Sequence, residues 1–425
     1  MDDLMNEWLA QAAAELEKQS AEYEKQQKVV ATKARKSSSQ QKKVETTASA
    51  TVSVSIPAKV QQTNQQQLEP IIQKAKDGDV PSILELKRLA KIGNAQAASA
   101  LEPLYYDGNK EHAVGTVILR EGLTSIGGMT FWFCKSLKEI VLPEGLISIG
   151  DKAFECCESL ERIILPKTLT SIGKDAFEHC SNLAKIVLPE SLTHLSAEAF
   201  KDCSNLKEII LPKSLTASNW SIGMNVFNGC KSLEKVILPE GLRFTSMGMF
   251  QDCSNLKEVF LPRSLISIAE HTFSGCTSLK EITLPETLKF IGWGALSGTS
   301  LEKVILPEGL TSIEKYAFSC CKNLKDIVLP KTLTSISDDA FSVCTSLREV
   351  ILPEGLTSIG QKAFSSCTSL REIVFPKTLK TTYSDLFQFC NNLNKITYHK
   401  SSEDFIKRCF GKDEWFKLHK IVIDD

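Results

Sequence analysis

The fold is decided by one stretch, residues 160–183, with the sequence LERIILPKTLTSIGKDAFEHCSNL. Its first six residues follow the pattern Leu-x-x-Ile-x-Leu, whose alternation predicts a strand with one buried side. Pro166 ends this strand, because proline lacks the amide hydrogen that a ladder requires. The Ile-Gly element then turns the chain, and the Ala-Phe-x-x-Cys segment carries it back along an outer arc.

This unit recurs along most of the chain. Successive Leu-Pro markers are 23 residues apart except for one interval of 27 and one of 22, and a fixed period of this kind predicts a solenoid. Less regular copies at 114–119 and 418–423 bring the expected number of coils to about fourteen. The proline of the marker, preceded by Phe rather than Leu in the last copy, stands at positions 143, 166, 189, 212, 239, 262, 285, 307, 330, 353 and 376.

The repeat resembles that of the BspA-like, or Treponema-type, leucine-rich-repeat family, from Val114 to the C-terminus. The resemblance implies an α/β-type repeat solenoid, curved and right-handed, with a parallel sheet on its concave face. Members of that family are often surface adhesins that bind host or matrix proteins. An exported adhesin is therefore the alternative to a cytoplasmic protein-binding scaffold.

Three segments precede the array. Residues 1–30 are predicted to form a helix, either a surface helix or a short coiled coil that supports weak self-association. Residues 31–66 are rich in Ser, Gln and Lys and predict a flexible, disordered linker. Residues 67–112 predict a small helical region or N-terminal cap, in which residues 93–108 resemble the start of a Sel1-type helical repeat. The solenoid follows over 113–398, and 399–425 form a C-terminal cap.

Composition limits the classes of partner. The formal net charge of -1 argues against nucleic acid as a partner. The first sixteen residues carry four acids and no Lys or Arg, unlike a secretory signal, and no apolar run is long enough to span a membrane. We therefore expect a cytoplasmic protein with mostly reduced cysteines, the alternative being a cell-surface or secreted protein exported by a non-classical route.

We predict from the sequence that the protein is not an enzyme. Eleven of the fourteen cysteines stand three residues after the column of phenylalanines, where a reduced thiol acts as a small apolar side chain. The six histidines are scattered without the spacing of a metal site or a catalytic triad. We predict no catalytic residue, metal or cofactor, and we expect Cys156, Cys320 and Cys409 to be the exposed thiols.

Two features predict protein binding. Alternation places a β-branched stripe outward on the sheet, which indicates either a binding surface or simple strand propensity. The 27-residue interval inserts residues 217–220, whose tryptophan either anchors a partner together with a nearby phenylalanine or folds back onto the array. The candidate protein-binding residues are Val187, Ile210, Ile237, Phe260, Ile305, Val328, Ile351, Trp220 and Phe244.

The residue after each marker proline alternates between acid and base from coil to coil, as at Glu308, Lys331, Glu354 and Lys377. Opposite charges on neighbouring coils are close enough to pair. We therefore expect ion pairs along this column, and the alternation fails once, at the 22-residue interval.

Overall fold

The computed structural model describes residues 68–105, 108–109, 111, 113–381, 383, 385–403, 406–407 and 420–423. The chain divides into two units, 1–66 and 67–425, and the described residues all belong to the second. The predictions for 1–30, for 31–66 and for Cys409 lie outside the described residues.

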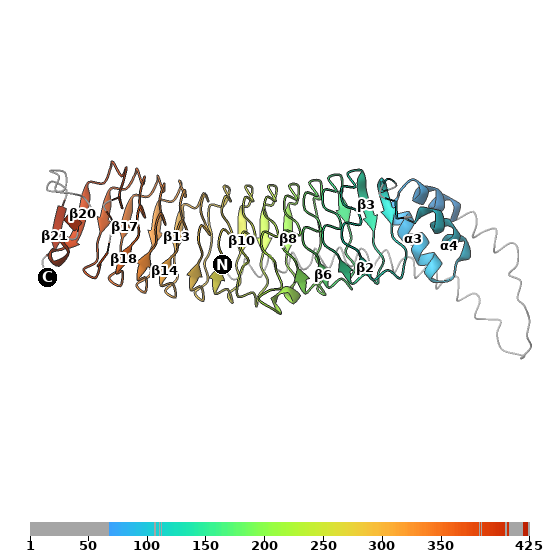
Figure 1. Ribbon diagram of the computed structural model, residues 1–425, viewed down its shortest axis with the longest axis horizontal. Coiled ribbons are helices and arrows are strands. Elements are labelled where there is room, and N and C mark those ends of the chain that lie inside the picture. The colour runs from blue at the N-terminus through green and yellow to red at the C-terminus, as the bar shows by residue number, and fades with distance from the viewer. Residues whose placement is uncertain are drawn as a thin grey trace, which may run out of the picture. The chain divides into compact units, whose positions relative to one another are not determined.

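The repeat forms a parallel β-solenoid, as the sequence predicts (Figure 1). The Leu-x-x-Ile-x-Leu segments form its longer strands, which pair in parallel with the equivalent segment of the neighbouring coil, for example β13 with β15. These strands are β1 (Gly115–Ile118), β3 (Leu137–Val141), β5 (Arg162–Ile163), β8 (Glu208–Ile210), β9 (Lys235–Ile237), β10 (Glu258–Phe260), β13 (Lys303–Ile305), β15 (Asp326–Val328), β17 (Glu349–Ile351), β19 (Glu372–Val374), β20 (Lys395–His399) and β21 (Lys420–Ile423).

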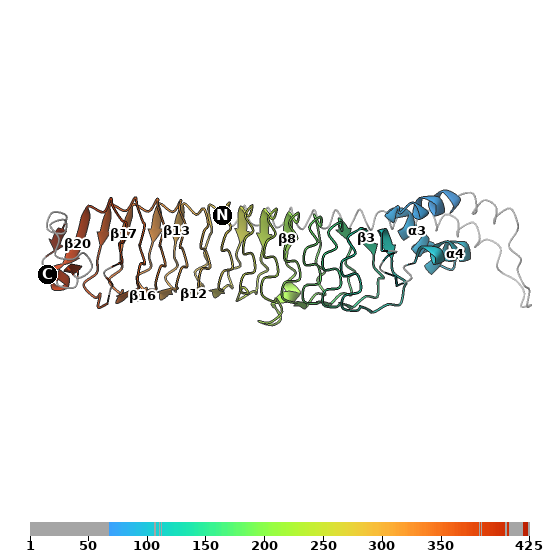
Figure 2. The ribbon, with the colours of Figure 1, turned by 45° about the horizontal axis from the view of Figure 1, so that its top comes forward.

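The Ser-Ile dipeptides, expected only to turn the chain, form a second set of parallel strands. Figure 2 shows the two sets on opposite edges of the array, with β13 and β17 along one and β12 and β16 along the other. We call the outward sides of the two sets the long-strand face and the Ser-Ile face. The second set comprises β2 (Ser125–Ile126), β4 (Ser148–Ile149), β6 (Ser171–Ile172), β7 (His194–Leu195), β11 (Ser267–Ile268), β12 (Phe290–Ile291), β14 (Ser312–Ile313), β16 (Ser335–Ile336) and β18 (Ser358–Ile359).

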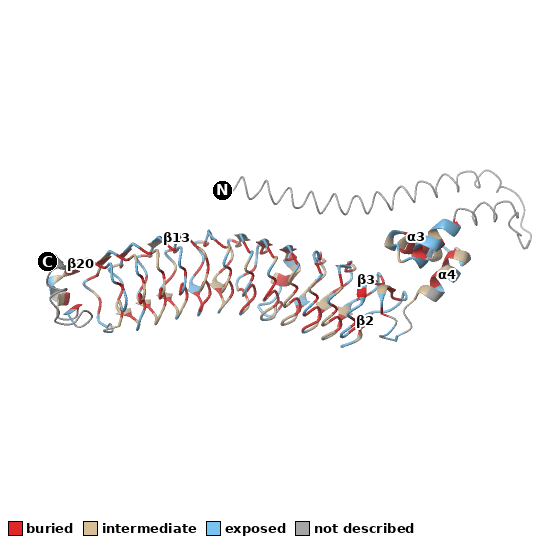
Figure 3. Ribbon diagram, turned by 90° about the horizontal axis from the view of Figure 1, so that it is seen from above, coloured by how far each residue is buried: buried red, intermediate tan, exposed pale blue. Residues whose placement is uncertain are grey.

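The core runs through the stack as columns of identical side chains, with buried residues inside every coil (Figure 3). Phe318, Phe341 and Phe364 are fully buried and stack at centroid distances of 5.3 Å, with ring planes within 7° of parallel. The column cysteines are also buried, and in nine of them Sγ donates to the carbonyl of a phenylalanine in the preceding coil, as Cys344 does to Phe318 at 3.2 Å, whereas Cys321 donates to the Leu296 carbonyl. The cysteine therefore fills space and satisfies a buried carbonyl.

Helices precede the first coil. Residues 68–76 are helical, and α3 (Val80–Lys91) and α4 (Ala95–Leu101) follow, capped by the side chains of Asp79 and Asn94. Their buried faces form one apolar cluster that also includes Ile118 and Val141 of the first two coils. Lys87 fixes this packing through a hydrogen bond to the Leu119 carbonyl at 3.3 Å.

The acid–base alternation after the prolines acts through the backbone. Glu308 Oε2 accepts a hydrogen bond from the backbone N–H of Lys331 at 3.0 Å, and Glu354 Oε2 accepts one from that of Lys377 at 3.3 Å. At these two steps the carboxylate therefore accepts a hydrogen bond from the main chain of the next coil, where an ion pair with the lysine side chain was expected.

None of the helices in the described part of the chain is long and apolar enough to cross a membrane.

Candidate protein-binding surfaces

The predicted β-branched stripe lies on the long-strand face. Ile305 pairs in register with Val328, and Ile351 follows in the next coil. Ile305 and Ile351 are 60% and 61% exposed, and Val328 and Val187 are about half exposed. These side chains therefore offer apolar area to a partner without any rearrangement of the array.

The middle of the stripe differs. Ile237 pairs in register with both Ile210 and Phe260 and is only 7% exposed, so the expectation that it faces solvent is wrong. Its neighbours on either side are half-buried and cover it. Lys235 adds to this cover, because its ammonium lies 5.2 Å from the centroid of the Phe260 ring.

Charged side chains beside the stripe neutralise each other across coils. Lys325 and Glu302 approach to 2.8 Å, and Lys235 and Glu258 to 3.1 Å. Each such exposed pair contributes only about 0 to 1 kcal/mol to stability. Four of the charges beside the apolar stripe therefore already have partners.

The four-residue insertion forms the second candidate surface. A 3-10 turn, η3 (Lys213–Thr216), leads into it, and Trp220 at its end is 89% exposed. The tryptophan therefore does not fold back onto the array. Phe244 is half-buried and pairs with Ser267 of the following coil on the Ser-Ile face, beneath the Arg243 guanidinium at 5.5 Å from its ring centroid.

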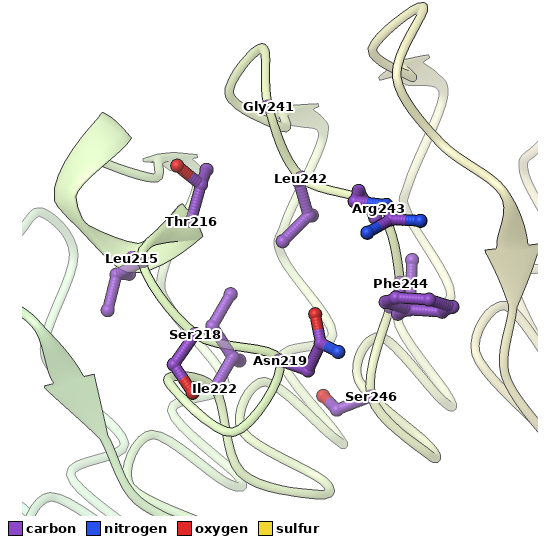
Figure 4. A pocket seen from close by; sticks show the side chains of 11 residues that line it. Leu215, Thr216, Ser218, Asn219, Ile222, Gly241, Leu242, Arg243, Phe244 and Ser246 are labelled. Carbon is purple, nitrogen blue, oxygen red and sulfur yellow. The ribbon is translucent and has the colours of Figure 1, made fainter.

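A cavity of about 40 Å³ lies between the insertion and the next coil. Figure 4 shows Ser218, Asn219 and Ile222 on one wall, with Arg243 and Phe244 on the other. Within the described part of the chain, no backbone hydrogen bond joins residues 213–223 to residues 239–246. The Ser-Ile ladder is therefore open at this step, as it also is between β12 and β14, and the coils join again where Asn225 donates to the Met247 carbonyl at 2.8 Å.

The thiols offer little chemistry. All thirteen described cysteines are free, and burial raises the pKa of Cys321 to about 12, so this thiol stays protonated at neutral pH. Cys320 is exposed, as expected, whereas Cys156, which was also expected to be exposed, is partly buried.

A charged cluster on the arcs of the third and fourth coils was missed from the sequence. Lys201 lies between Glu178 and Glu198, with N···O distances of 2.8 and 3.1 Å, and these carboxylates raise the pKa of its ammonium well above the usual value. His179 adds contacts of 3.7 Å to Glu178 and Asp202. The ammonium occupies the centre of the acids, so the cluster is a network of ion pairs. Its only signal in the sequence is the recurrence of charge at equivalent positions of successive arcs.

Comparisons with known proteins agree with this architecture. The model of the BspA type leucine rich repeat region matches residues 109–219, 214–325 and 311–424. A leucine-rich repeat protein from Bacteroides ovatus is similar, with 30% identity over 75% of this chain and 97% of its own, at a TM-score of 0.54. The leucine-rich repeat protein of T. pallidum is 33% identical over 39% of this chain and 78% of its own, at a TM-score of 0.36.

A leucine rich cell surface protein from Faecalibacterium prausnitzii is 24% identical over 74% of this chain and 92% of its own, at a TM-score of 0.41. None of the curated proteins compared with the chain matches it. The family model covers three quarters of the sequence, from the first strand to the last. The chain belongs to the BspA-type leucine-rich-repeat family.

Proposed function

We propose that this protein is a non-enzymatic scaffold that binds another protein through its long-strand face. The observation that carries the proposal is the exposure of Ile305, Val328 and Ile351 in consecutive coils, beside the ion pair between Lys325 and Glu302. An exposed apolar stripe costs solubility, so its presence on a regular surface favours a binding role. Parallel strands also present such side chains in a row without any loop having to order on binding.

The test is affinity capture with the full chain, read by mass spectrometry, beside a variant with Ile305, Val328 and Ile351 changed to Ser. A matched control carries Ile147→Ser and Met129→Ser, which remove exposed apolar side chains away from the long-strand face. We expect to capture a partner that binds the wild type and the control equally well. Its Kd for the triple variant should be at least tenfold higher, which corresponds to about 1.4 kcal/mol. Equal capture by all three would contradict the proposal, provided that circular dichroism shows all three to be folded.

The compartment in which the protein is found distinguishes a cytoplasmic scaffold from an exported adhesin. A scaffold of the cytoplasm would remain with the soluble cell contents, whereas an adhesin would be cleaved by protease added to intact cells. Either result leaves the long-strand face as the proposed contact and changes the class of partner from a cellular protein to a host or matrix protein.

A further inference from the structure

Exposed apolar side chains on and beside the Ser-Ile face concentrate in the middle of the array. The regular coils present Ser and Thr there, as Thr334-Ser335 and Thr357-Ser358 do, whereas coil five carries Trp220 and coils six and eight carry Arg243-Phe244 and Lys289-Phe290. We call this surface the mid-array patch, and we define it as Trp220, Arg243, Phe244, Lys289, Phe290 and Trp293.

Two phenylalanines of the patch lie in one column of the Ser-Ile face. Phe244 pairs with Ser267, and Ser267 pairs with Phe290, so the two phenylalanines stand two ladder steps apart in the outward-facing column. Two steps correspond to about 9.5 Å between backbones. The Ser267 side chain between them is small, so we treat the two rings as aromatic walls that an apolar side chain of a partner can contact.

Two cations adjoin these walls. Arg243 and Lys289 directly precede the phenylalanines and are both exposed. Among the described residues, neither makes an ion pair, in contrast to Lys235 and Lys325 on the long-strand face. The guanidinium of Arg243 is held over the Phe244 ring, which reduces the side-chain entropy that binding would cost.

The open ladder step adds backbone groups to the same surface. Within the described residues, the N–H of Ile222 donates no backbone hydrogen bond toward the next coil and its carbonyl accepts none, and the buried Ser246 hydroxyl has no partner. These groups line the cavity beneath Arg243 and Phe244 (Figure 4). Unpaired main-chain groups beside aromatic walls suit an extended peptide, which carries both donors and acceptors.

We infer that the mid-array patch docks an acidic peptide segment of a partner protein, with the acids on Arg243 and Lys289 and an apolar side chain between Phe244 and Phe290. An anionic membrane or a nucleic acid fits less well, because Glu240, Glu270 and Glu286 are exposed on the same coils and would repel a surface of uniform negative charge. A peptide can place its acids beside the cations alone. This inference uses the Ser-Ile side of the array and does not depend on the proposed role of the long-strand face.

The experiment selects a random dodecapeptide library displayed on phage against the full chain, and measures the enriched peptides by fluorescence polarisation. We expect enrichment of peptides with two or more acids next to an aromatic or aliphatic residue. Their Kd should rise at least tenfold for Arg243→Glu/Lys289→Glu and for Phe244→Ser/Phe290→Ser, and stay within twofold for the control Ile305→Ser/Ile351→Ser. Replacing the acids of the peptide by lysine should restore binding to the Arg243→Glu/Lys289→Glu variant.

Loss of the proposed contact on the long-strand face would leave these results unchanged, so the two proposals fail separately. Three outcomes would overturn the inference: no enrichment of acidic peptides, enrichment that both patch variants retain, or binding only to vesicles containing phosphatidylserine. Circular dichroism and the melting temperature of each variant establish that a loss of binding does not reflect unfolding.

Discussion

Replacing Phe341 tests how the array is held together. Its ring is fully buried and stacked between Phe318 and Phe364 at 5.3 Å on either side. Phe341→Ala removes the ring and leaves a cavity, which costs about 3–5 kcal/mol in proteins generally. Phe341→Leu keeps most of the buried apolar area and loses two stacking contacts, each of about 0.5–1.5 kcal/mol, so we expect about 1–3 kcal/mol.

The assay is native-state hydrogen exchange read by mass spectrometry, because one global free energy of unfolding is poorly defined for a long repeat array. Each coil contacts only its neighbours, so faster exchange should be confined to the coils of Phe318, Phe341 and Phe364. The coil of Phe154, eight positions away in the column, should exchange as in the wild type. Equal acceleration at Phe154, or an alanine variant that costs less than the leucine variant, would refute this reasoning.

Three further predictions concern single positions. Gly223→Ala should lower the melting temperature, because an added Cβ would lie 2.2 Å from the backbone nitrogen of Ala197, whereas the control Gly145→Ala meets no atom within 4 Å and should change stability by less than about 1 kcal/mol. Iodoacetamide at neutral pH should label Cys320 before Cys344 in peptide mapping, because Cys320 is exposed and the buried Cys344 has a pKa well above the usual value; labelling of both at one rate would contradict this. Stability should fall as the pH rises from about 8.5, where an unfolded thiol ionises, toward about 12, because the folded state keeps Cys321 protonated. The melting temperature should fall less steeply with pH in Cys321→Ala than in the wild type. Identical slopes for the two proteins would contradict this prediction.

The sequence was sufficient to predict the solenoid because its apolar columns recur with a fixed period. The positions of Phe341 and Cys344 in the stack follow from that period alone. The second ladder was not predicted, because Ser-Ile strands of two residues are too short to show an alternation. Whether neighbours would cover Ile237 depends on how Ile210 and Phe260 pack around it, which periodicity does not determine.

The irregular coils were harder to predict for a related reason. The insertion that ends at Trp220 has no equivalent elsewhere in the array, so its sequence was compatible with both an exposed and a folded-back tryptophan. The spacing of Glu354 and Lys377 placed them on neighbouring coils. The Glu354 carboxylate can accept a hydrogen bond from either an ammonium or a backbone amide, and only its rotamer determines which of the two is its partner. Departures from the repeat, such as Phe244 and Phe290 in a column of serines, were visible in the sequence, and the second ladder shows that they lie on one face.

Hydroxyl-radical footprinting of the captured complex tests the central claim most directly, because it reports the solvent accessibility of individual side chains. If the long-strand face is the binding surface, oxidation of Ile305, Val328 and Ile351 should fall several-fold in the complex relative to the free chain, while oxidation of Met129 stays unchanged. Unaltered oxidation of those three side chains in a complex that protects residues elsewhere would contradict the account.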